Sequence, residues 1–344
     1  MILTPTSASV PFGRCFEKAR AKKQLFNAIF ELTHHCNFDC AHCYIPKKQA
    51  RKELSFSEIK SIIDQLYKSG CLYITFTGGE IFTRNDIFEI LEHAKKRCMR
   101  INLFTNGSLI DSSAAERLAR LGGFLNRIEI SFLGATARTF ETITRTPGSF
   151  KRVTKAIKLL RDMDRSVALK IVLMRQNQHE IPRFLKAIRA HDCKGQFSAV
   201  VFSKNDGDTQ PLAYRLSPPE AHAALKNVFG NGIDLEGLGC NSGECLMGKT
   251  SAVIDPYGKM SSCLLIRRPG YDLLEIPVNE AWEKIKVFLE KFYKMNSQEC
   301  KSCSLKRQCM SCPGFLMAET GRLNGCSEWM KKVAILKMRD NGHF

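Results

Sequence analysis

Three closely spaced cysteines near the start of the 344-residue chain are the first residues whose types and spacing suggest chemistry. The spacing C-x3-C-x2-C is that of Cys36, Cys40 and Cys43. A structural zinc would need a fourth ligand besides three thiolates, and His34, His35 or His42 could supply it. An iron–sulfur cluster held by three cysteines would instead leave one iron with an open coordination position. The cysteine spacing alone leaves both centres open.

Small and polar residues stand where the following apolar, β-branched segments end. Gly78-Gly79-Glu80 closes one such segment, Asn106 follows the next, and Ser131 lies near the end of a third. Adjacent glycines allow the backbone to approach a ligand closely, and Glu80 offers a carboxylate to a cation such as an amino group. Together these residues suit a polar, zwitterionic ligand beside an open iron, which favours the iron–sulfur centre.

The elements that must position these residues alternate between strands and helices. Short apolar β-branched runs predict strands at 26–33, 72–77, 100–105, 127–133, 167–174 and 196–202. Helical periodicity predicts helices at 55–70, 86–98, 112–121, 149–163, 179–191 and 217–229. This alternation implies an α/β fold whose parallel sheet is closed or partly closed into a barrel. Active sites of such barrels lie at the carboxyl ends of the strands, so we expect the cysteine loop after the first strand at that mouth.

A second set of cysteines begins after residue 239, where the sequence becomes cysteine-rich and loop-heavy. Its members are Cys240, Cys245, Cys263, Cys300, Cys303, Cys309, Cys312 and Cys326. A zinc ribbon also uses two C-x2-C pairs, but its pairs usually stand about 15–20 residues apart, whereas five residues separate Cys303 from Cys309. Zinc in one of these sites remains an alternative. The isolated cysteines, which we expect to be ordinary thiols, are Cys15, Cys71, Cys98 and Cys193.

Composition and charge limit the class of protein. The chain is 44% hydrophobic and 25% charged, and it contains neither an apolar run long enough to span a membrane nor a signal peptide. We therefore expect a cytoplasmic protein, because a reduced compartment favours metal binding by clustered cysteines over disulfides. The net charge of +18 suggests an anionic partner. The lysines and arginines are spread along the chain, which disfavours a nucleic-acid role.

The cysteine loop after the first strand, with Gly-Gly-Glu ending the second, resembles the radical S-adenosylmethionine (radical SAM) superfamily, whose members share a partial (β/α)6 barrel. The resemblance implies a [4Fe-4S] cluster held by Cys36, Cys40 and Cys43, with the amino and carboxylate groups of S-adenosylmethionine on its fourth iron. The residues implied to bind the methionine amine are Gly78, Gly79 and Glu80. Those implied to contact the carboxylate or ribose are Asn106, Ser131 and Arg145. His42 departs mildly from the family, which usually has an aromatic residue there.

The resemblance also implies the chemistry. One electron, from a donor of the flavodoxin or ferredoxin type, cleaves S-adenosylmethionine to a 5′-deoxyadenosyl radical, which abstracts hydrogen from a substrate. The cofactor does the difficult chemistry, and the protein supplies orientation and excludes water.

The later cysteines, together with Gly258, closely resemble in their order the SPASM extension of radical SAM enzymes that modify peptides. One spacing departs from the pattern, because two residues separate Cys309 from Cys312 where three are usual. The resemblance implies an auxiliary [4Fe-4S] cluster I on Cys240, Cys245, Cys263 and Cys312. It implies an auxiliary [4Fe-4S] cluster II on Cys300, Cys303, Cys309 and Cys326. Cys240 resembles the eighth ligand, which closes the first of these clusters.

We expect five divisions of the chain: an N-terminal segment (1–25), the radical SAM core barrel (26–205), a linker with a helix (206–238), the SPASM domain with its two auxiliary clusters (239–330) and a C-terminal tail (331–344).

Three functions follow as hypotheses. The leading one is modification of a ribosomally made peptide, with any leader peptide held by a separate partner, because the N-terminal segment is too short for a leader-binding domain. Leu264 follows Cys263, where the sulfatase maturases carry an aspartate base, which argues against sulfatase maturation. The alternative is a radical SAM enzyme acting on a small anionic cofactor precursor such as a haem-pathway tetrapyrrole. A zinc-dependent nucleic-acid-binding protein is the third hypothesis.

Overall fold

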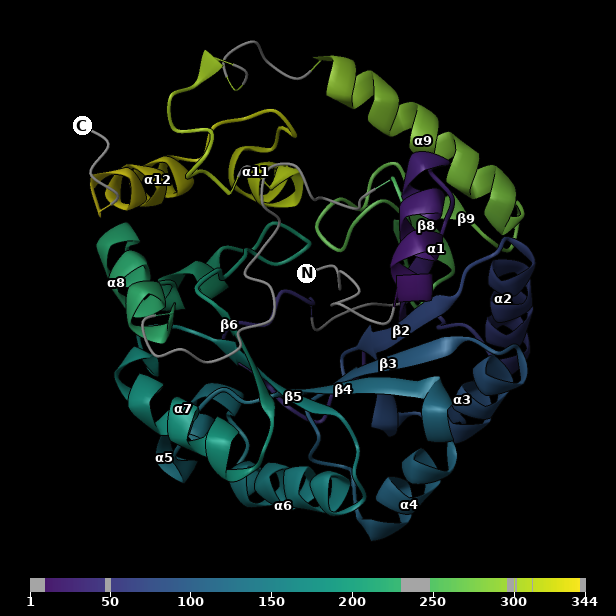
Figure 1. Cartoon of the computed structure of the whole chain (residues 1–344), viewed down its shortest axis with the longest axis horizontal. Coiled ribbons are helices and arrows are strands. Elements are labelled where there is room, and N and C mark those ends of the chain that lie inside the picture. Colours follow the sequence, from purple (N-terminus) through teal and green to yellow (C-terminus); the bar gives the residue numbers. More distant parts are fainter. Residues whose placement is uncertain are drawn as a thin grey trace.

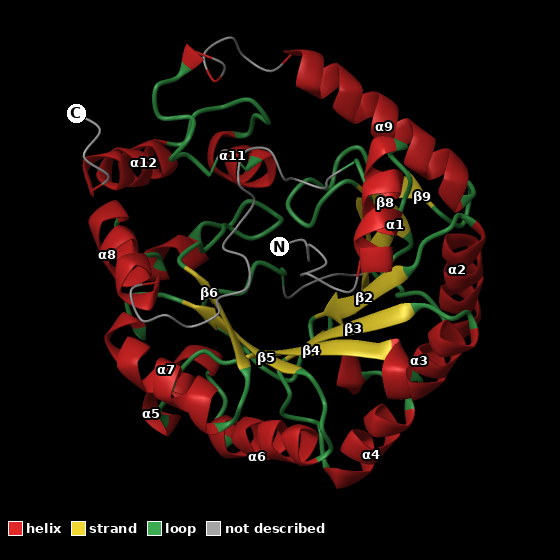
Figure 2. Ribbon diagram, in the orientation of Figure 1, coloured by secondary structure: helices red, strands yellow, loops and turns green. Residues whose placement is uncertain are grey.

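A nine-stranded sheet with the strand order β6-β5-β4-β3-β2-β1-β7-β8-β9 forms the centre of the computed structural model. The structure describes residues 10–46, 51–229, 248–295, 300, 302–310 and 312–340. The strands lie on the inner side of an arc of helices (Figure 2). The first six strands, all parallel to their neighbours, are β1 (Asn27–Thr33), β2 (Tyr73–Gly78), β3 (Arg100–Thr105), β4 (Leu125–Ser131), β5 (Val167–Val172) and β6 (Lys194–Ser198).

Helices follow these strands and cover the outer face of the sheet (Figure 1). Their bounds are α2 (Phe56–Lys68), α3 (Ile87–Lys96), α4 (Ser112–Arg120), α5 (Ala137–Thr144), α6 (Ser149–Asp162), α7 (Ile181–Ala190) and α8 (Pro218–Phe229). Short 3-10 helices are η1 (Ile81–Thr83), η2 (Gly122–Phe124), η3 (Gln178–Glu180) and η4 (Gln210–Tyr214). The expected partial (β/α)6 barrel is therefore confirmed, and α5 is a helix that the sequence did not predict.

Local sequence explains why these elements form where they do. Ser55 and Glu58 make the expected capping box at the start of α2, each accepting a hydrogen bond from the other's backbone N–H. Apolar residues at helical spacing then bury one face of α2 against the sheet.

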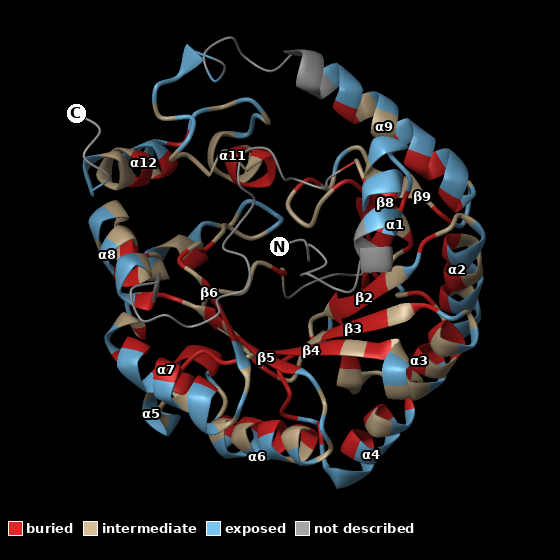
Figure 3. Ribbon diagram, in the orientation of Figure 1, coloured by how far each residue is buried: buried red, intermediate tan, exposed pale blue. Residues whose placement is uncertain are grey.

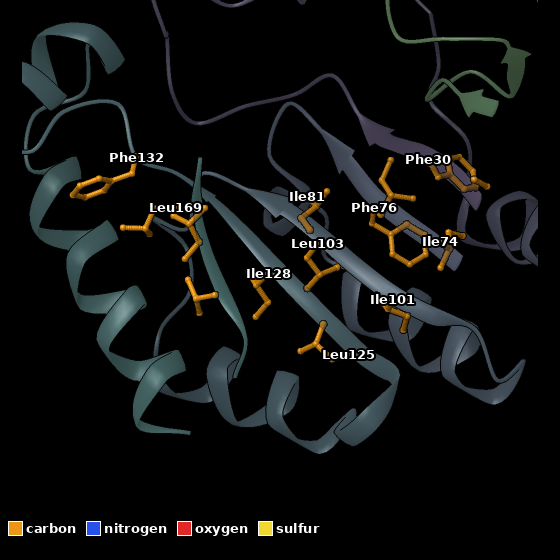
Figure 4. Close-up of a cluster of buried hydrophobic side chains, with 14 of the residues drawn as sticks. Phe30, Ile74, Phe76, Ile81, Ile101, Leu103, Leu125, Ile128, Phe132 and Leu169 are labelled. Atoms are coloured by element: carbon orange, nitrogen blue, oxygen red, sulfur yellow. The ribbon is translucent and has the colours of Figure 1, made fainter. Parts of the chain in front are cut away.

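The core lies between the outer face of the sheet and this layer of helices. Figure 4 shows side chains of neighbouring strands meeting there, among them Phe30, Phe76, Leu103, Ile128 and Leu169. Figure 3 shows the strands buried and the outward faces of the helices exposed. Removal of this apolar surface from water holds the helices against the outer face of the sheet. Polar residues of the site lie instead at the carboxyl ends of the strands.

The C-terminal part of the chain continues the same sheet. The strand β7 (Ser251–Ile254) pairs in parallel with β1, and β8 (Lys259–Ser261) and β9 (Tyr271–Asp272) follow in antiparallel order. The helices of this region are α9 (Val278–Met295), α11 (Pro313–Thr320) and α12 (Glu328–Asp340), and α1 (Val10–Ala21) precedes the barrel. The helix α12 lies against α8 (Figure 1) and runs across the expected boundary between the SPASM domain, ending at 330, and the tail, beginning at 331. Within the described ranges, no helix combines the length and apolar character needed to cross a membrane.

Asn177 fixes the chain where it leaves β4 and β5. Its buried side chain donates hydrogen bonds to the carbonyls of Leu133 (2.9 Å) and Val172 (2.8 Å) and accepts one from the N–H of Met174 (2.7 Å). These bonds pair buried backbone groups where the two strands end.

We expect Asn177→Ala to lower the free energy of unfolding by roughly 2–3 kcal/mol, because it leaves buried backbone groups unpaired. The urea midpoint, followed anaerobically by far-ultraviolet circular dichroism, measures the change. Asn279→Ala, at an exposed position of α9, is the control and should leave the midpoint unchanged. Equal midpoints for the two variants would contradict this role of Asn177.

Candidate functional site

The cysteine loop lies at the carboxyl end of β1, as expected. Its backbone is held by the end of α5, because the N–H groups of Asp39 and Ala41 donate to the carbonyls of Thr144 (3.1 Å) and Ile143 (2.9 Å). The last carbonyls of a helix have no partner within the helix, so they are free to bind another segment. The unpredicted helix α5 thus positions the three cysteines.

The three thiols influence one another electrostatically. Burial raises the pKa of the Cys36 thiol to about 11, and it raises the pKa of Cys40, where the charges of Cys43 and Cys36 add to the effect. Thiols in such surroundings ionise only beside a strong positive charge, which a bound iron would supply. The Cys36 sulfur also accepts hydrogen bonds from the N–H of Phe38 (3.4 Å) and the Asn106 amide (3.9 Å). This donor set fits an iron–sulfur cluster, whose properties depend on hydrogen bonds to its sulfurs.

The two glycines that follow β2 permit direct contact with the chain leading to Cys36. The N–H of Gly79 donates to the carbonyl of Thr33 (2.7 Å), and the N–H of Glu80 donates to that of His35 (2.8 Å). A Cβ atom on Gly78 would lie 2.2 Å from the Thr33 oxygen, and one on Gly79 would lie 2.2 Å from the His35 oxygen. The sequence suggested that the lack of side chains on these glycines lets a ligand approach. In the structure it lets the backbone of the cysteine loop approach.

Glu80 is buried and joins two loops of the site. Its carboxylate accepts hydrogen bonds from the hydroxyl of Thr105 (2.7 Å) and from the N–H groups of Asn106 (2.6 Å) and Phe82 (3.1 Å). Burial raises the pKa of Glu80, although these hydrogen bonds oppose the effect. Asn106 in turn donates to the side-chain oxygen of Asn37 (2.8 Å) within the cysteine loop. A carboxylate has about four acceptor positions, so three bonds leave room for one further donor.

The two remaining expected contacts of S-adenosylmethionine lie in different surroundings. Ser131 ends β4 and stands opposite Lys170 of β5 in the sheet register. Arg145 follows α5 in a left-handed conformation; its guanidinium lies 3.5 Å from the Asp39 carboxylate and donates to the Tyr214 hydroxyl (3.2 Å). The structure therefore brings Arg145 to the cysteine loop through Asp39, which is itself part of that loop.

A buried ion pair that the sequence did not predict lies beside the loop. Glu31, fully buried in β1, accepts two hydrogen bonds from Arg267 (2.6 and 3.0 Å) and one from the Tyr44 hydroxyl (3.3 Å). Burial alone would raise the pKa of Glu31, but the Arg267 charge and its hydrogen bonds, together with the nearby His34, lower the pKa to about 2. A glutamate inside the apolar run of the first strand was the available signal, but its partner is more than two hundred residues away.

Some of the described C-terminal cysteines lie near one another, and Cys309 packs with Cys312 against the apolar cluster of Phe315, Leu316 and Met330. Burial raises the pKa of the Cys263 thiol, and the nearby Cys312 adds to the effect. Burial also raises the pKa of the Cys326 thiol, and the nearby Cys300 and Cys303 add to the effect. These neighbours belong to the same expected sets, whereas Cys240 and Cys245 lie outside the described residues. Among the residues described, no group of three or more His, Cys, Asp or Glu side chains is placed to hold a single metal ion.

Comparison with known families identifies the barrel. Residues 30–188 match the model of the radical SAM superfamily. These residues therefore form a radical SAM domain, and such a domain implies a [4Fe-4S] cluster and S-adenosylmethionine as cofactors.

Known proteins resemble the chain over different lengths. The AdoMet-dependent heme synthase of Methanosarcina barkeri is 25% identical over 327 residues, which cover 85% of this chain and 92% of the relative. The PqqA peptide cyclase of Granulibacter bethesdensis is 33% identical over 164 residues, which cover 47% of this chain and 43% of the cyclase, less than half its length. The crystal structure of Streptococcus suis SuiB bound to the precursor peptide SuiA superimposes with a TM-score of 0.72, at 16% identity, covering 96% of this chain and 84% of SuiB. This last likeness establishes the fold.

We expect Gly79→Ala to displace the cysteine loop, because the added Cβ would clash with a backbone oxygen that has no freedom to rotate away. Anaerobically reconstituted protein should then lose about four irons per chain, the content of one cluster. Gly123→Ala is a matched control, since a Cβ there meets nothing within 4 Å. Full iron content in Gly79→Ala would show that the close approach of the two loops does not hold the cysteines in place.

Proposed function

We propose that this chain is an enzyme that cleaves S-adenosylmethionine reductively and removes a hydrogen atom from a substrate. The observation that carries the proposal is the single network in which the cysteine loop, the Gly-Gly-Glu loop and Asn106 are bonded to one another at the barrel mouth. When bound, the cluster and S-adenosylmethionine supply a 5′-deoxyadenosyl radical. The chain orients the cluster and S-adenosylmethionine and excludes water from them.

The residues of this network have distinct parts in the proposal. Cys36, Cys40 and Cys43 hold the cluster. The free acceptor position of Glu80 takes a hydrogen bond from the methionine ammonium, and the backbone of Gly78 and Gly79 lies beside it. Asn106, Ser131 and Arg145 are the proposed contacts to the carboxylate or ribose.

Two auxiliary [4Fe-4S] clusters in a SPASM domain are part of the same proposal. Cys263 and Cys312 belong to cluster I, together with Cys240 and Cys245. Cys300, Cys303, Cys309 and Cys326 belong to cluster II. The nearness of Cys312 to Cys263, and of Cys300 and Cys303 to Cys326, agrees with this division, although Cys309 packs beside Cys312.

A peptide is the substrate that we propose first. The peptide cyclase relative and the fold shared with SuiB, which was solved with a precursor peptide, support it. A tetrapyrrole is the second candidate, favoured by the heme synthase that matches nearly the whole chain. A flavodoxin or ferredoxin would supply the electron, a separate protein would hold any leader peptide, and a reducing cytoplasm would preserve the clusters.

We expect the anaerobically reconstituted enzyme to bind roughly 12 irons, four for each cluster. Replacement of Cys36, Cys40 and Cys43 by alanine should leave roughly eight irons and abolish formation of 5′-deoxyadenosine with dithionite. The double variant Cys15→Ala/Cys98→Ala, at two exposed thiols, controls for general loss of cysteine. Stoichiometric zinc and negligible iron in protein that was never exposed to oxygen would overturn the proposed function.

Glu80→Gln keeps the size of the side chain but removes its negative charge. A hydrogen bond to a charged group is worth about 1.5–3 kcal/mol, so affinity for S-adenosylmethionine should fall by roughly one to two decades. Isothermal titration of the reconstituted protein measures this, with Glu89→Gln on the exposed face of α3 as the control. Unchanged affinity would show that Glu80 serves only to join the two loops.

A further inference from the structure

A basic pocket lies beside the cysteine loop, between the barrel and the C-terminal strands. We define it by His34, Arg51, Tyr257, Lys259, Arg267 and Arg268, which line a cavity of about 510 Å3. This volume falls within the range of roughly 300–1,000 Å3 that small-ligand sites occupy. The pocket is therefore large enough for part of a substrate.

The charge of the basic pocket is unbalanced. Arg267 is neutralised by Glu31, and the one carboxylate in the wall, Asp255, accepts hydrogen bonds from the backbone N–H groups of Tyr257 and Lys259 (both 2.9 Å). The cations that form no ion pair with any residue in the described ranges are Arg51, Lys259 and Arg268. A second carboxylate, Glu53, lies beside the wall and accepts a hydrogen bond from the N–H of His34 (2.7 Å). The three cations still outnumber these two bonded carboxylates, so the pocket favours an anion.

Two buried nitrogens in the wall also have no hydrogen-bond partner. They are Nε of Arg267 and Nε2 of His34, whose side chain is only 10% exposed and whose Nε2 lies 3.7 Å from the Glu31 carboxylate, too far for a hydrogen bond. The other His34 nitrogen lies 3.4 Å from the Tyr257 hydroxyl. Arg267 Nε is a donor, and His34 Nε2 is one when the Tyr257 hydroxyl donates to the other ring nitrogen. A buried donor without a partner is costly, and an acceptor group of a ligand relieves that cost. The hydrogen-bonding character of the wall therefore agrees with its charge.

The basic pocket is attached to both ends of the cysteine loop. His34 precedes Cys36 by two residues, and the N–H of Asn205, another residue of the wall, donates to the carbonyl of Tyr44 (2.9 Å), directly after Cys43. A ligand held here is therefore beside the loop proposed to bind the cluster.

We propose that the basic pocket binds a carboxylate of the substrate and so fixes the carbon that loses hydrogen. This inference rests on the function proposed above, because it needs a substrate at the barrel mouth. Two sources could supply the carboxylate: an Asp or Glu side chain of a peptide, or a propionate of a tetrapyrrole. Lys259 and Arg268 have no ionic partner among the described residues, so we assign the recognition to them and to Arg51.

Binding of two fluorescent probes to the reconstituted holoenzyme tests the proposal. One probe is a rhodamine-labelled short peptide of alternating glutamate and glycine, compared with the same peptide carrying glutamine. The other is coproporphyrin III, a tetrapyrrole with propionate groups. We expect at least one carboxylate probe to bind, and Lys259→Gln/Arg268→Gln to weaken it by about tenfold or more.

Two further variants separate specific recognition from folding and from overall charge. Lys259→Arg/Arg268→Lys keeps both charges and should retain binding within a few-fold. Lys158→Gln/Arg189→Gln removes two exposed cations from the outer helices α6 and α7, and it should change affinity by no more than about twofold, since exposed distant charges are screened.

The probe that responds identifies the source of the carboxylate. Three results would each overturn the proposal: neither carboxylate probe binding better than the glutamine peptide, equal binding by the parent and Lys259→Gln/Arg268→Gln, or an equal loss in the outer-helix variant. Formation of 5′-deoxyadenosine by the parent enzyme is measured separately. Its absence would refute the proposed function, whereas the binding results decide on the pocket.

Discussion

Direct contact between two backbone segments at the barrel mouth is the constraint on which the site depends. The segment from Thr33 to His35 lies against Gly78 and Gly79 with no side chain between them. This contact sets the separation between the cysteine loop and Glu80, and through Glu80 the position of Asn106. Because backbone atoms have no rotamers with which to adjust, the geometry tolerates little change. The rest of the barrel, including the core on its outer face, supports these two segments.

Two buried glutamates near this contact show how surroundings determine the behaviour of a carboxylate. Glu80 is bonded only by neutral donors, so burial prevails and its pKa is raised. Glu31 faces the guanidinium of Arg267, which lowers its pKa to about 2. Glu80 is therefore suited to receive a cationic group, since its charge has no permanent counterion. The charge of Glu31 is already matched, and its pair with Arg267 instead joins the barrel to the C-terminal region.

The sequence predicted the parts of the fold that have a strong local signal. Strand β3 was placed at its observed bounds, and α2 was recognised from its capping box, because both patterns lie within a few residues. The short helix α5 was missed, although its last carbonyls hold the cysteine loop. The strand β7 has only four residues and depends on pairing with β1, more than two hundred residues earlier, so no local pattern reveals it. Arg267 was missed for the same reason.

The pairing of β7 with β1 has a consequence for how the protein folds. During synthesis, β1 and the other strands of the barrel are made well before β7. Until β7 is made, the backbone groups on one edge of β1 have no strand to pair with. An uncovered apolar edge of this kind is a template for association with other chains. Pairing with β7 would cover that edge, so the edge of β1 would stay exposed until the C-terminal region has been made. The C-terminal region therefore completes the sheet of the barrel through β7, in addition to the auxiliary clusters proposed for it.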